Sequence, residues 1–255
     1  MEFEISRSTG DALTLRRRFF PEANIGGVSH VDSGVAFYTQ INAILRPEDR
    51  VLDFGAGRGE HIVDEQVKFR RNLFNLQGRC AHVEGVDLDA AVLSNPYLDH
   101  AAVMRKGDPL PYADNSFDIV VSRFVFEHID DPDYIAAELL RVVKPGGIIA
   151  ALTPNKYGYI ALAGRSVPNR LHVKWLRAIQ PNRKSVDVFP TTYLLNTPRA
   201  LNAAFGAQAD IYVSYIAGEP AYYFGNVILY RLTNWIHKHL PDRLQPLNMV
   251  FICKR

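Results

Sequence analysis

The sequence predicts an α/β fold with a doubly wound, mostly parallel sheet and helices on both of its faces. Short runs of apolar β-formers alternate with segments whose apolar residues recur at helical spacing, as in consecutive strand–helix–strand units. A glycine-rich turn, residues 55–59, directly follows the first of the apolar runs that belong to this pattern. Ligands of such sheets bind in the crevice beyond the carboxyl ends of the strands, so we expect the functional residues at those ends.

The predicted elements follow one another at regular spacing. Strands are expected at residues 50–54, 81–86, 101–105, 117–122, 148–152, 210–216 and 248–253. Helices are expected at residues 35–45, over about three turns after Gly59, from an Asp89 cap through Leu93, and at residues 132–143, 198–204 and 222–240. Asp131 and Pro132 are a typical helix start, and the glycines at 146 and 147 follow its end.

The pattern divides the chain into a cap and a domain. Residues 1–49 mix aromatic and basic side chains around a helical segment, so we expect an N-terminal helical cap there. Residues 50–255 form the α/β domain. After Thr153 the alternation breaks, and residues 154–197 are long for a plain connection. We expect this segment to be an insertion on the substrate side.

Composition excludes several classes of function. The chain of 255 residues has 29 Lys and Arg against 27 Asp and Glu, too even a balance for bulk nucleic-acid binding. Cys80 and Cys253 fit neither a disulfide framework nor the spacing of zinc ligands, so no metal is expected. The start lacks the features of a secretory signal, and no apolar run is long enough to span a bilayer. These observations predict a soluble cytoplasmic protein.

The glycine-rich turn carries the clearest chemical signal. Residues 53–59 read Asp-Phe-Gly-Ala-Gly-Arg-Gly, which brings backbone close to a ligand at the amino end of the following helix. The spacing differs from the GxGxxG of dinucleotide sites. Asp53 would repel a pyrophosphate but suits a cationic amino group.

Further motifs follow this turn in a fixed order. They are Gly85-Val86-Asp87, Gly107-Asp108, Leu110-Pro111, Phe117-Asp118, Glu127-His128 and Lys144-Pro145-Gly146-Gly147. With this series, residues 50–153 resemble the class I S-adenosylmethionine-dependent methyltransferases, especially the type 11 subgroup. The resemblance implies a Rossmann-like seven-stranded sheet with an antiparallel last strand. It also implies that S-adenosyl-L-methionine is the cofactor and S-adenosyl-L-homocysteine the product.

The resemblance also assigns the cofactor residues. Asp53, Gly55, Gly57 and Gly59 would hold the methionine part, Asp87 the ribose hydroxyls and Asp108 the adenine amino group. Asp108 stands closer to Leu110 and Pro111 than the usual spacing of the family, so its assignment departs further from the pattern than that of Asp87. Neighbours of these positions complete the expected cofactor site: Ala56, Leu88, Gly107, Ser122 and Arg123.

The acceptor side is less specific. Glu127 and His128 follow the strand at 117–122, and His128 is either a general base or, as we favour, a structural or cofactor-side residue. The candidates for substrate contact are His30, Tyr38, Asn155, Tyr157 and His172. Several cations of the insertion form an anion-binding patch or a solvated surface, namely Arg165, Arg170, Lys174, Arg177, Arg183 and Lys184.

The helix expected at 222–240 is amphipathic with a basic tail. Phe224, Ile228, Leu232, Trp235 and Ile236 share one face. We favour packing of this face on the sheet, and peripheral membrane contact is the alternative.

Together these features predict methyl transfer to a small-molecule, glycan or lipid-linked acceptor, on oxygen or nitrogen. Two other hypotheses remain: a non-catalytic S-adenosylmethionine-binding protein of the same fold and, disfavoured by the glycine spacing, an NAD-dependent oxidoreductase.

Overall fold

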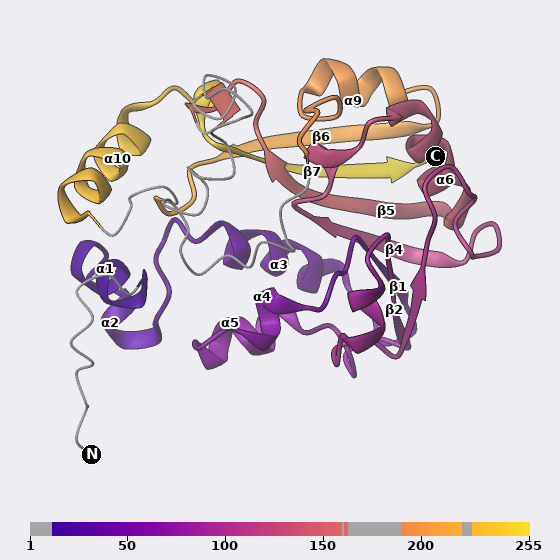
Figure 1. Ribbon diagram of the computed structural model, residues 1–255, viewed down its shortest axis with the longest axis horizontal. Helices are drawn as coiled ribbons and strands as arrows, with labels where there is room; N and C mark the ends of the chain where they lie inside the picture. Colours follow the sequence, from indigo (N-terminus) through magenta and orange to yellow (C-terminus); the bar gives the residue numbers. More distant parts are fainter. Residues whose placement is uncertain (1–11, 160, 163–189, 221–225) are drawn as a thin grey trace.

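The computed structural model describes residues 12–159, 161–162, 190–220 and 226–255, and its centre is one seven-stranded sheet (Figure 1). The strand order is β3-β2-β1-β4-β5-β7-β6. The strands are β1 Arg50–Phe54, β2 His82–Asp87, β3 His100–Val103, β4 Phe117–Arg123, β5 Val143–Pro154, β6 Ala209–Ile216 and β7 Leu247–Lys254. β7 runs antiparallel to both of its neighbours, β5 and β6, and the other six strands point the same way. The predicted doubly wound, mostly parallel sheet is confirmed.

Helices cover both faces of this sheet and bury apolar side chains on each. One face packs against α3 Ser33–Ile44, α4 Glu60–Val63 and α5 Lys68–Phe74 through Phe37, Ile62 and Phe74. The other packs against α6 Pro132–Val142 and α9 Pro198–Phe205 through Leu139 and Phe205. The central strands are therefore buried on both sides, which explains why they read as continuous apolar runs.

Several predicted helix boundaries hold. Asp131 caps α6 by accepting a hydrogen bond from the Tyr134 amide, with Pro132 in the first turn. Thr197 caps α9 in the same way, through the Ala200 amide. Asp89 caps through the Ala91 amide, but the element it starts, η1 Ala90–Ser94, is a 3-10 helix. The proline at position 96 disfavours helical backbone at the residue before it, so the turn cannot lengthen.

The predicted three-turn helix after Gly59 is wrong, because the segment forms two short helices, α4 and α5. Glu65 lies between them, and its side chain accepts a hydrogen bond from the Val67 amide while its carbonyl accepts one from the Arg71 guanidinium. These bonds satisfy polar groups locally that a continuous helix would use along its axis. The chain turns at this point.

The cap reaches the crevice through α3. Asp32 caps α3 through the Val35 amide and forms an ion pair with Arg70 of α5, which also pairs with Glu65 at 2.6 Å. Asn42 donates hydrogen bonds to the carbonyls of Tyr38 and, at 3.0 Å, Leu73. These contacts hold α3 beside α5.

A second helical group lies beyond the end of the sheet that is opposite the C-terminus (Figure 1). It contains α1 Ala12–Phe19, α2 Ala23–Gly26 and α10 Val227–His239. Arg16 of α1 pairs with Glu219 at 2.7 Å, and Ser29 donates a hydrogen bond to the same carboxylate. The boundary at residue 49 and the insertion at 154–197 stay predictions, and residues 163–189 lie outside the described part of the chain.

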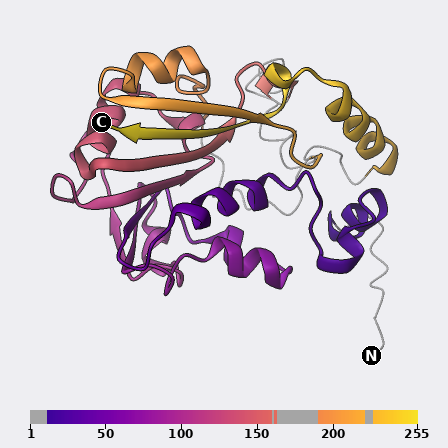
Figure 2. The same ribbon diagram turned by 180° about the vertical axis from the view of Figure 1, so that it is seen from behind.

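The favoured packing for α10 is wrong. Its apolar residues Ile228, Leu232 and Trp235 are 79%, 51% and 58% exposed, while Thr233 and His237 are buried. The helix packs on α1 instead of the sheet (Figure 2), because Tyr230 stacks on Phe19 at 4.8 Å between ring centroids. Residues 222–225 of the predicted helix lie outside the described part. No helix among the described residues has the length and apolarity needed to cross a membrane.

Candidate functional site

Three neighbouring strands end in charged residues at one edge of the sheet. Asp53 stands near the end of β1, Asp87 ends β2 and Arg123 ends β4, and β1 pairs in parallel with both other strands. The side chains interact electrostatically: Asp87 raises the pKa of Asp53, and Arg123 lowers it. The structure therefore brings together three predicted cofactor residues from separate motifs.

The glycine-rich turn lies against Asp87. The Gly57 amide donates a hydrogen bond of 2.9 Å to one carboxylate oxygen of Asp87, and the Asp89 amide donates one to the other. Gly55, Gly57 and Gly59 all have positive φ, a conformation that favours glycine. Ala56 is buried within this turn.

Gly55 and Gly59 also leave no room for a side chain. A Cβ atom at Gly55 would lie 2.2 Å from a methyl group of Val125, and one at Gly59 would lie 2.5 Å from the amide oxygen of Asn95. Asn95 donates in turn to the carbonyls of Ala56 and Gly57. Asn95 is a site residue that the sequence analysis missed, since its contact depends on a turn more than thirty residues away.

The charge at the turn is an excess of carboxylate. Burial and the nearby carboxylates of Asp87 and Glu60 raise the pKa of Asp53 to about 7, against the opposing effect of Arg123. Burial also raises the pKa of Asp87, although the amides of Asp89 and Gly57 stabilise its ionised form. Asp53 is therefore held at high energy when ionised, and a bound cation would relieve this cost.

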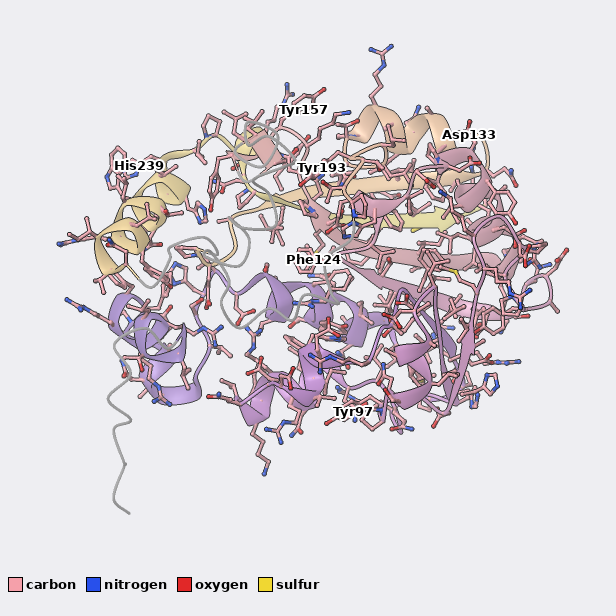
Figure 3. The ribbon with its side chains drawn as sticks, in the orientation of Figure 1. Tyr97, Phe124, Asp133, Tyr157, Tyr193 and His239 are labelled. Carbon is pink, nitrogen blue, oxygen red and sulfur yellow. The ribbon has the colours of Figure 1, made fainter. Side chains whose placement is uncertain are left out.

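Two buried polar atoms at the end of β4 fit a polar ligand, and one of them belongs to Arg123, which interacts with Asp53. Among the described residues, the Ser122 hydroxyl and the Arg123 Nε atom are buried without a hydrogen-bond partner. Burial lowers the pKa of Arg123, and its guanidinium lies over the ring of Phe124, 4.8 Å from the centroid. Phe124 has a φ of +57°, unusual for a side-chain-bearing residue, and lies beside α3 (Figure 3). Strained backbone of this kind clusters at functional sites.

Tyr38 reaches the same place from α3. It lines a small cavity together with Asp53 and Phe74, and its ring stacks on Phe74 at 4.6 Å between centroids. A hydrogen bond of 3.0 Å joins the Tyr38 hydroxyl to Nε2 of His61. Burial and the cations Arg123 and Arg70 keep the pKa of His61 well below its usual value, so this imidazole is neutral. His61 was not among the predicted site residues, although it lies just after the glycine-rich turn in the sequence.

Glu127 has structural contacts. Its buried carboxylate accepts a hydrogen bond of 2.9 Å from the Thr153 hydroxyl, and Thr153 accepts another from the Asn196 amide. The Thr192 amide donates to the Glu127 carbonyl, and His128 donates through Nδ1 to the carbonyl of Pro190 at 2.8 Å. These bonds join the loop after β4 to β5 and to residues 190–196.

The remaining candidates lie apart. Asn155 is buried, its side-chain amide nitrogen donates to the carbonyls of Arg243 and Gln245, and its amide oxygen accepts from the Tyr157 amide. Its contact with a substrate stays a prediction. His30 is bonded to Glu22 within the cap. Four positions are exposed, and nothing places them beside Asp53: Tyr157, Leu88, Gly107 and Asp108. His172 and the predicted basic patch lie outside the described residues. No cluster of metal-binding type occurs in the described part of the chain.

Comparison with known proteins gives this site a family. Residues 52–151 match the model of a methyltransferase domain. A probable S-adenosylmethionine-dependent methyltransferase of Mycolicibacterium smegmatis is 34% identical over 102 residues, 38% of this chain and 39% of that protein. A ubiquinone/menaquinone biosynthesis C-methyltransferase of Vibrio cholerae is 30% identical over 124 residues, 44% of this chain and 43% of that protein. The matched part spans less than half of either relative.

Solved structures agree with the fold. The crystal structure of an S-adenosylmethionine-dependent methyltransferase of Thermotoga maritima has a TM-score of 0.50 at 14% identity, covering 95% of this chain and 99% of that one. This likeness supports the seven-stranded architecture. The match and the named relatives make residues 52–151 similar to the class I S-adenosylmethionine-dependent methyltransferases of the type 11 kind, and they support S-adenosylmethionine as the cofactor.

Proposed function

We propose that this chain transfers the methyl group of S-adenosylmethionine to a small-molecule, glycan or lipid-linked acceptor. The observation that carries the proposal is the convergence of Asp53, Asp87 and Glu60 on the glycine-rich turn. A carboxylate with a raised pKa is suited to a ligand that brings an ammonium group and hydroxyl donors. The half-buried, free Cys80 and Cys253 support a reducing compartment, and a cytoplasmic location is part of the proposal.

Different residues of the crevice would contact different parts of the cofactor. Asp53 and the turn Gly55, Gly57 and Gly59 would hold the methionine part, and Asp87 would accept hydrogen bonds from the ribose hydroxyls. Asp108 remains the proposed contact of the adenine amino group, and Leu88 remains a proposed neighbour in the cofactor site. The unpartnered atoms of Ser122 and Arg123 would meet polar groups of the cofactor or the acceptor.

The bound cofactor supplies an electrophilic methyl group, and the protein aligns an acceptor with it. Most of the rate of such a displacement can come from alignment, and a base is needed only where the acceptor carries a proton. Tyr38 is the proposed acceptor-side residue of the cap, and His61 positions its hydroxyl through their hydrogen bond. Oxygen and nitrogen are the proposed acceptor atoms, and the quinone C-methyltransferase among the relatives makes carbon the competing one.

Binding of the cofactor should depend on pH through Asp53. Its raised pKa, about 7 against an ordinary 3.8, means that the free protein keeps the proton below neutrality. In the free protein, burial disfavours the ionised carboxylate. Asp53 therefore lowers the stability of the folded state as the pH rises from 3.8, its pKa in the unfolded chain, toward 7. An ammonium ligand reverses this preference. We expect S-adenosylhomocysteine to bind about 10-fold more weakly one pH unit below the pKa than well above it.

Calorimetric titration at several pH values measures this effect, with proton release detected by changing the buffer. Asp53→Asn should remove its share of the pH dependence. An unchanged slope in that variant would show that another group is responsible, and release of no proton by the wild type would contradict the charge argument.

His128 should matter less than its position suggests. His128→Asn is expected to keep kcat/KM within about 10-fold of wild type, because we favour a structural role for His128. Removal of a general base would instead lower kcat/KM by roughly 100-fold or more. The asparagine amide can still donate toward the Pro190 carbonyl that His128 contacts. Steady-state kinetics across pH provide the check, and a large loss together with a missing acidic limb would assign His128 as the base.

The proposed function is tested by methyl transfer itself. Purified protein is incubated with methyl-labelled S-adenosylmethionine and separate small-molecule, glycan and lipid extracts, with Asp87→Ala protein alongside. Label should enter one class of extract with the wild type only. The linkage of the labelled product identifies oxygen, nitrogen or carbon. Cofactor binding without transfer to any extract would favour the non-catalytic alternative.

A further inference from the structure

The exposed face of α10 reverses the usual order of an amphipathic helix. Ile228, Leu232 and Trp235 follow one another at the spacing of helical turns, and they are 79%, 51% and 58% exposed. The buried face of the same helix holds Tyr230, Thr233, Asn234 and His237. The buried face therefore combines the aromatic ring of Tyr230 with three polar side chains, while three large apolar side chains face outward. Exposure of these large apolar side chains to water is unfavourable, so the exposed face is suited to contact with an apolar surface.

The inward orientation is fixed by specific contacts. Tyr230 stacks on Phe19 of α1, and His237 bonds through one ring nitrogen to the Gly218 carbonyl and through the other to the Tyr159 hydroxyl at 2.7 Å. The Gln245 amide donates to the His237 carbonyl. These bonds prevent the helix from rotating to bury Trp235 without breaking partly buried hydrogen bonds.

Basic residues border the apolar stripe. At about 100° per residue, Arg231 and Lys238 lie on one edge of the stripe, and both are exposed. α10 has no acidic residue, and neither has α1, which packs against it and adds the exposed Arg17 and Arg18. The nearest acidic residues are Asp242, beyond the end of α10, and Glu219 and Glu22, which pair with Arg16 and His30. The His239 ring contacts Trp235 in a tilted arrangement, with 4.5 Å between ring centroids.

We propose that α10 lies flat on a membrane rich in anionic lipid, with Ile228, Leu232 and Trp235 in the interfacial layer and Arg231 and Lys238 beside the headgroups. An apolar stripe with a tryptophan and a cationic edge is the arrangement of helices that bind in the membrane plane. A second copy of the chain would bring no acidic residue on α10 to meet Arg231 and Lys238, whereas anionic headgroups would. Figure 3 shows His239 on α10 well away from Phe124, which lies in the crevice. Membrane binding through α10 would therefore not cover the crevice. The proposal stands whether or not the acceptor is a lipid.

Vesicle flotation tests the proposal with the full chain. The vesicles contain phosphatidylcholine alone or equimolar phosphatidylcholine and phosphatidylglycerol. We expect the wild type to float with the anionic vesicles, and less as salt is raised. Leu232→Gln with Trp235→Gln should lower the partition coefficient at least about 10-fold. Arg231→Gln with Lys238→Gln should lower it by roughly 5-fold per charge on anionic vesicles only.

A matched control separates the stripe from general apolar exposure. Phe69 and Tyr212 lie on α5 and β6, away from the stripe. Their exposed fractions, 52% and 60%, are similar to those of Leu232 and Trp235. Phe69→Gln with Tyr212→Gln should float like the wild type. Each variant must retain the melting temperature and S-adenosylhomocysteine affinity of the wild type, which excludes misfolding and keeps this test independent of methyl transfer.

Three results would overturn the proposal. They are wild-type protein that floats with neither vesicle, a stripe variant that floats like the wild type, and a wild-type dimer that the stripe variant converts to a monomer without vesicle binding. The last would assign the face to a second copy of the chain.

Discussion

Asp87→Ala is expected to weaken S-adenosylmethionine binding by about 100-fold or more. The carboxylate would lose its hydrogen bonds with the ribose hydroxyls, and bonds to a charged group contribute roughly 1.5–3 kcal/mol each. It would also release the Gly57 amide, which it accepts from at 2.9 Å, so the turn would lose its anchor on β2. Calorimetric titration of the purified protein with S-adenosylmethionine measures this effect.

Asp64→Asn is the matched control for this substitution. Asp64 is an exposed carboxylate at the end of α4, paired with Arg58 at 2.9 Å. Its loss changes the net charge of the protein by the same amount at a site that we do not assign to the ribose. Asp64→Asn should keep its affinity, and an Asp87→Ala protein that binds as tightly as the wild type would remove Asp87 from the cofactor site.

Gly55→Ala is expected to lower the free energy of unfolding by about 2–6 kcal/mol. Part of this cost is the positive φ of 79°, since strain of that kind amounts to about 1–3 kcal/mol. The rest is overpacking, because the new methyl group would lie 2.2 Å from Val125, and such insertions cost about 1–3 kcal/mol. The melting temperature should fall by roughly 5–20 °C in a chain of this size.

Gly78→Ala is the control that separates the conformational cost from the overpacking cost. Gly78 has nearly the same φ, 76°, but a Cβ atom there would meet nothing within 4 Å. Gly78→Ala should therefore show the conformational part alone, and Val125→Ala in the Gly55→Ala background should restore part of the loss. Equal melting temperatures for the two single variants would contradict the close approach of Val125 to the turn.

The sequence was most informative where local chemistry determines structure. The short apolar runs predicted the strands within about two residues at each end, except that β5 begins at Val143 instead of residue 148. The central strands are the easiest to predict, because strands buried on both faces have little freedom in composition. The caps at Asp131 and Asp89 were also predictable, because each carboxylate accepts a hydrogen bond from an amide only two or three residues away. The motif order predicted which strand ends meet, and Asp53, Asp87 and Arg123 do lie together.

The features that the sequence did not predict depend on contacts between distant segments. The break between α4 and α5 follows from bonds of Glu65 to Val67 and Arg71, which compete with helix continuation. The hydrogen bond between Tyr38 and His61 joins the cap to the helix after the turn. The orientation of α10 was mistaken because periodicity identifies the apolar face of a helix and not its neighbour. There the aromatic stack on α1 and the bonds of His237 decide which face is buried.

The central claim is that the turn from Asp53 to Gly59 is built for a cofactor with a cationic amino acid end. A calorimetric comparison of S-adenosylhomocysteine with NAD, each titrated into the same wild-type protein at neutral pH, tests this claim most directly. S-adenosylhomocysteine should bind at one site per chain and NAD should produce no saturable heat. Saturable binding of NAD together with no saturable binding of S-adenosylhomocysteine would contradict it.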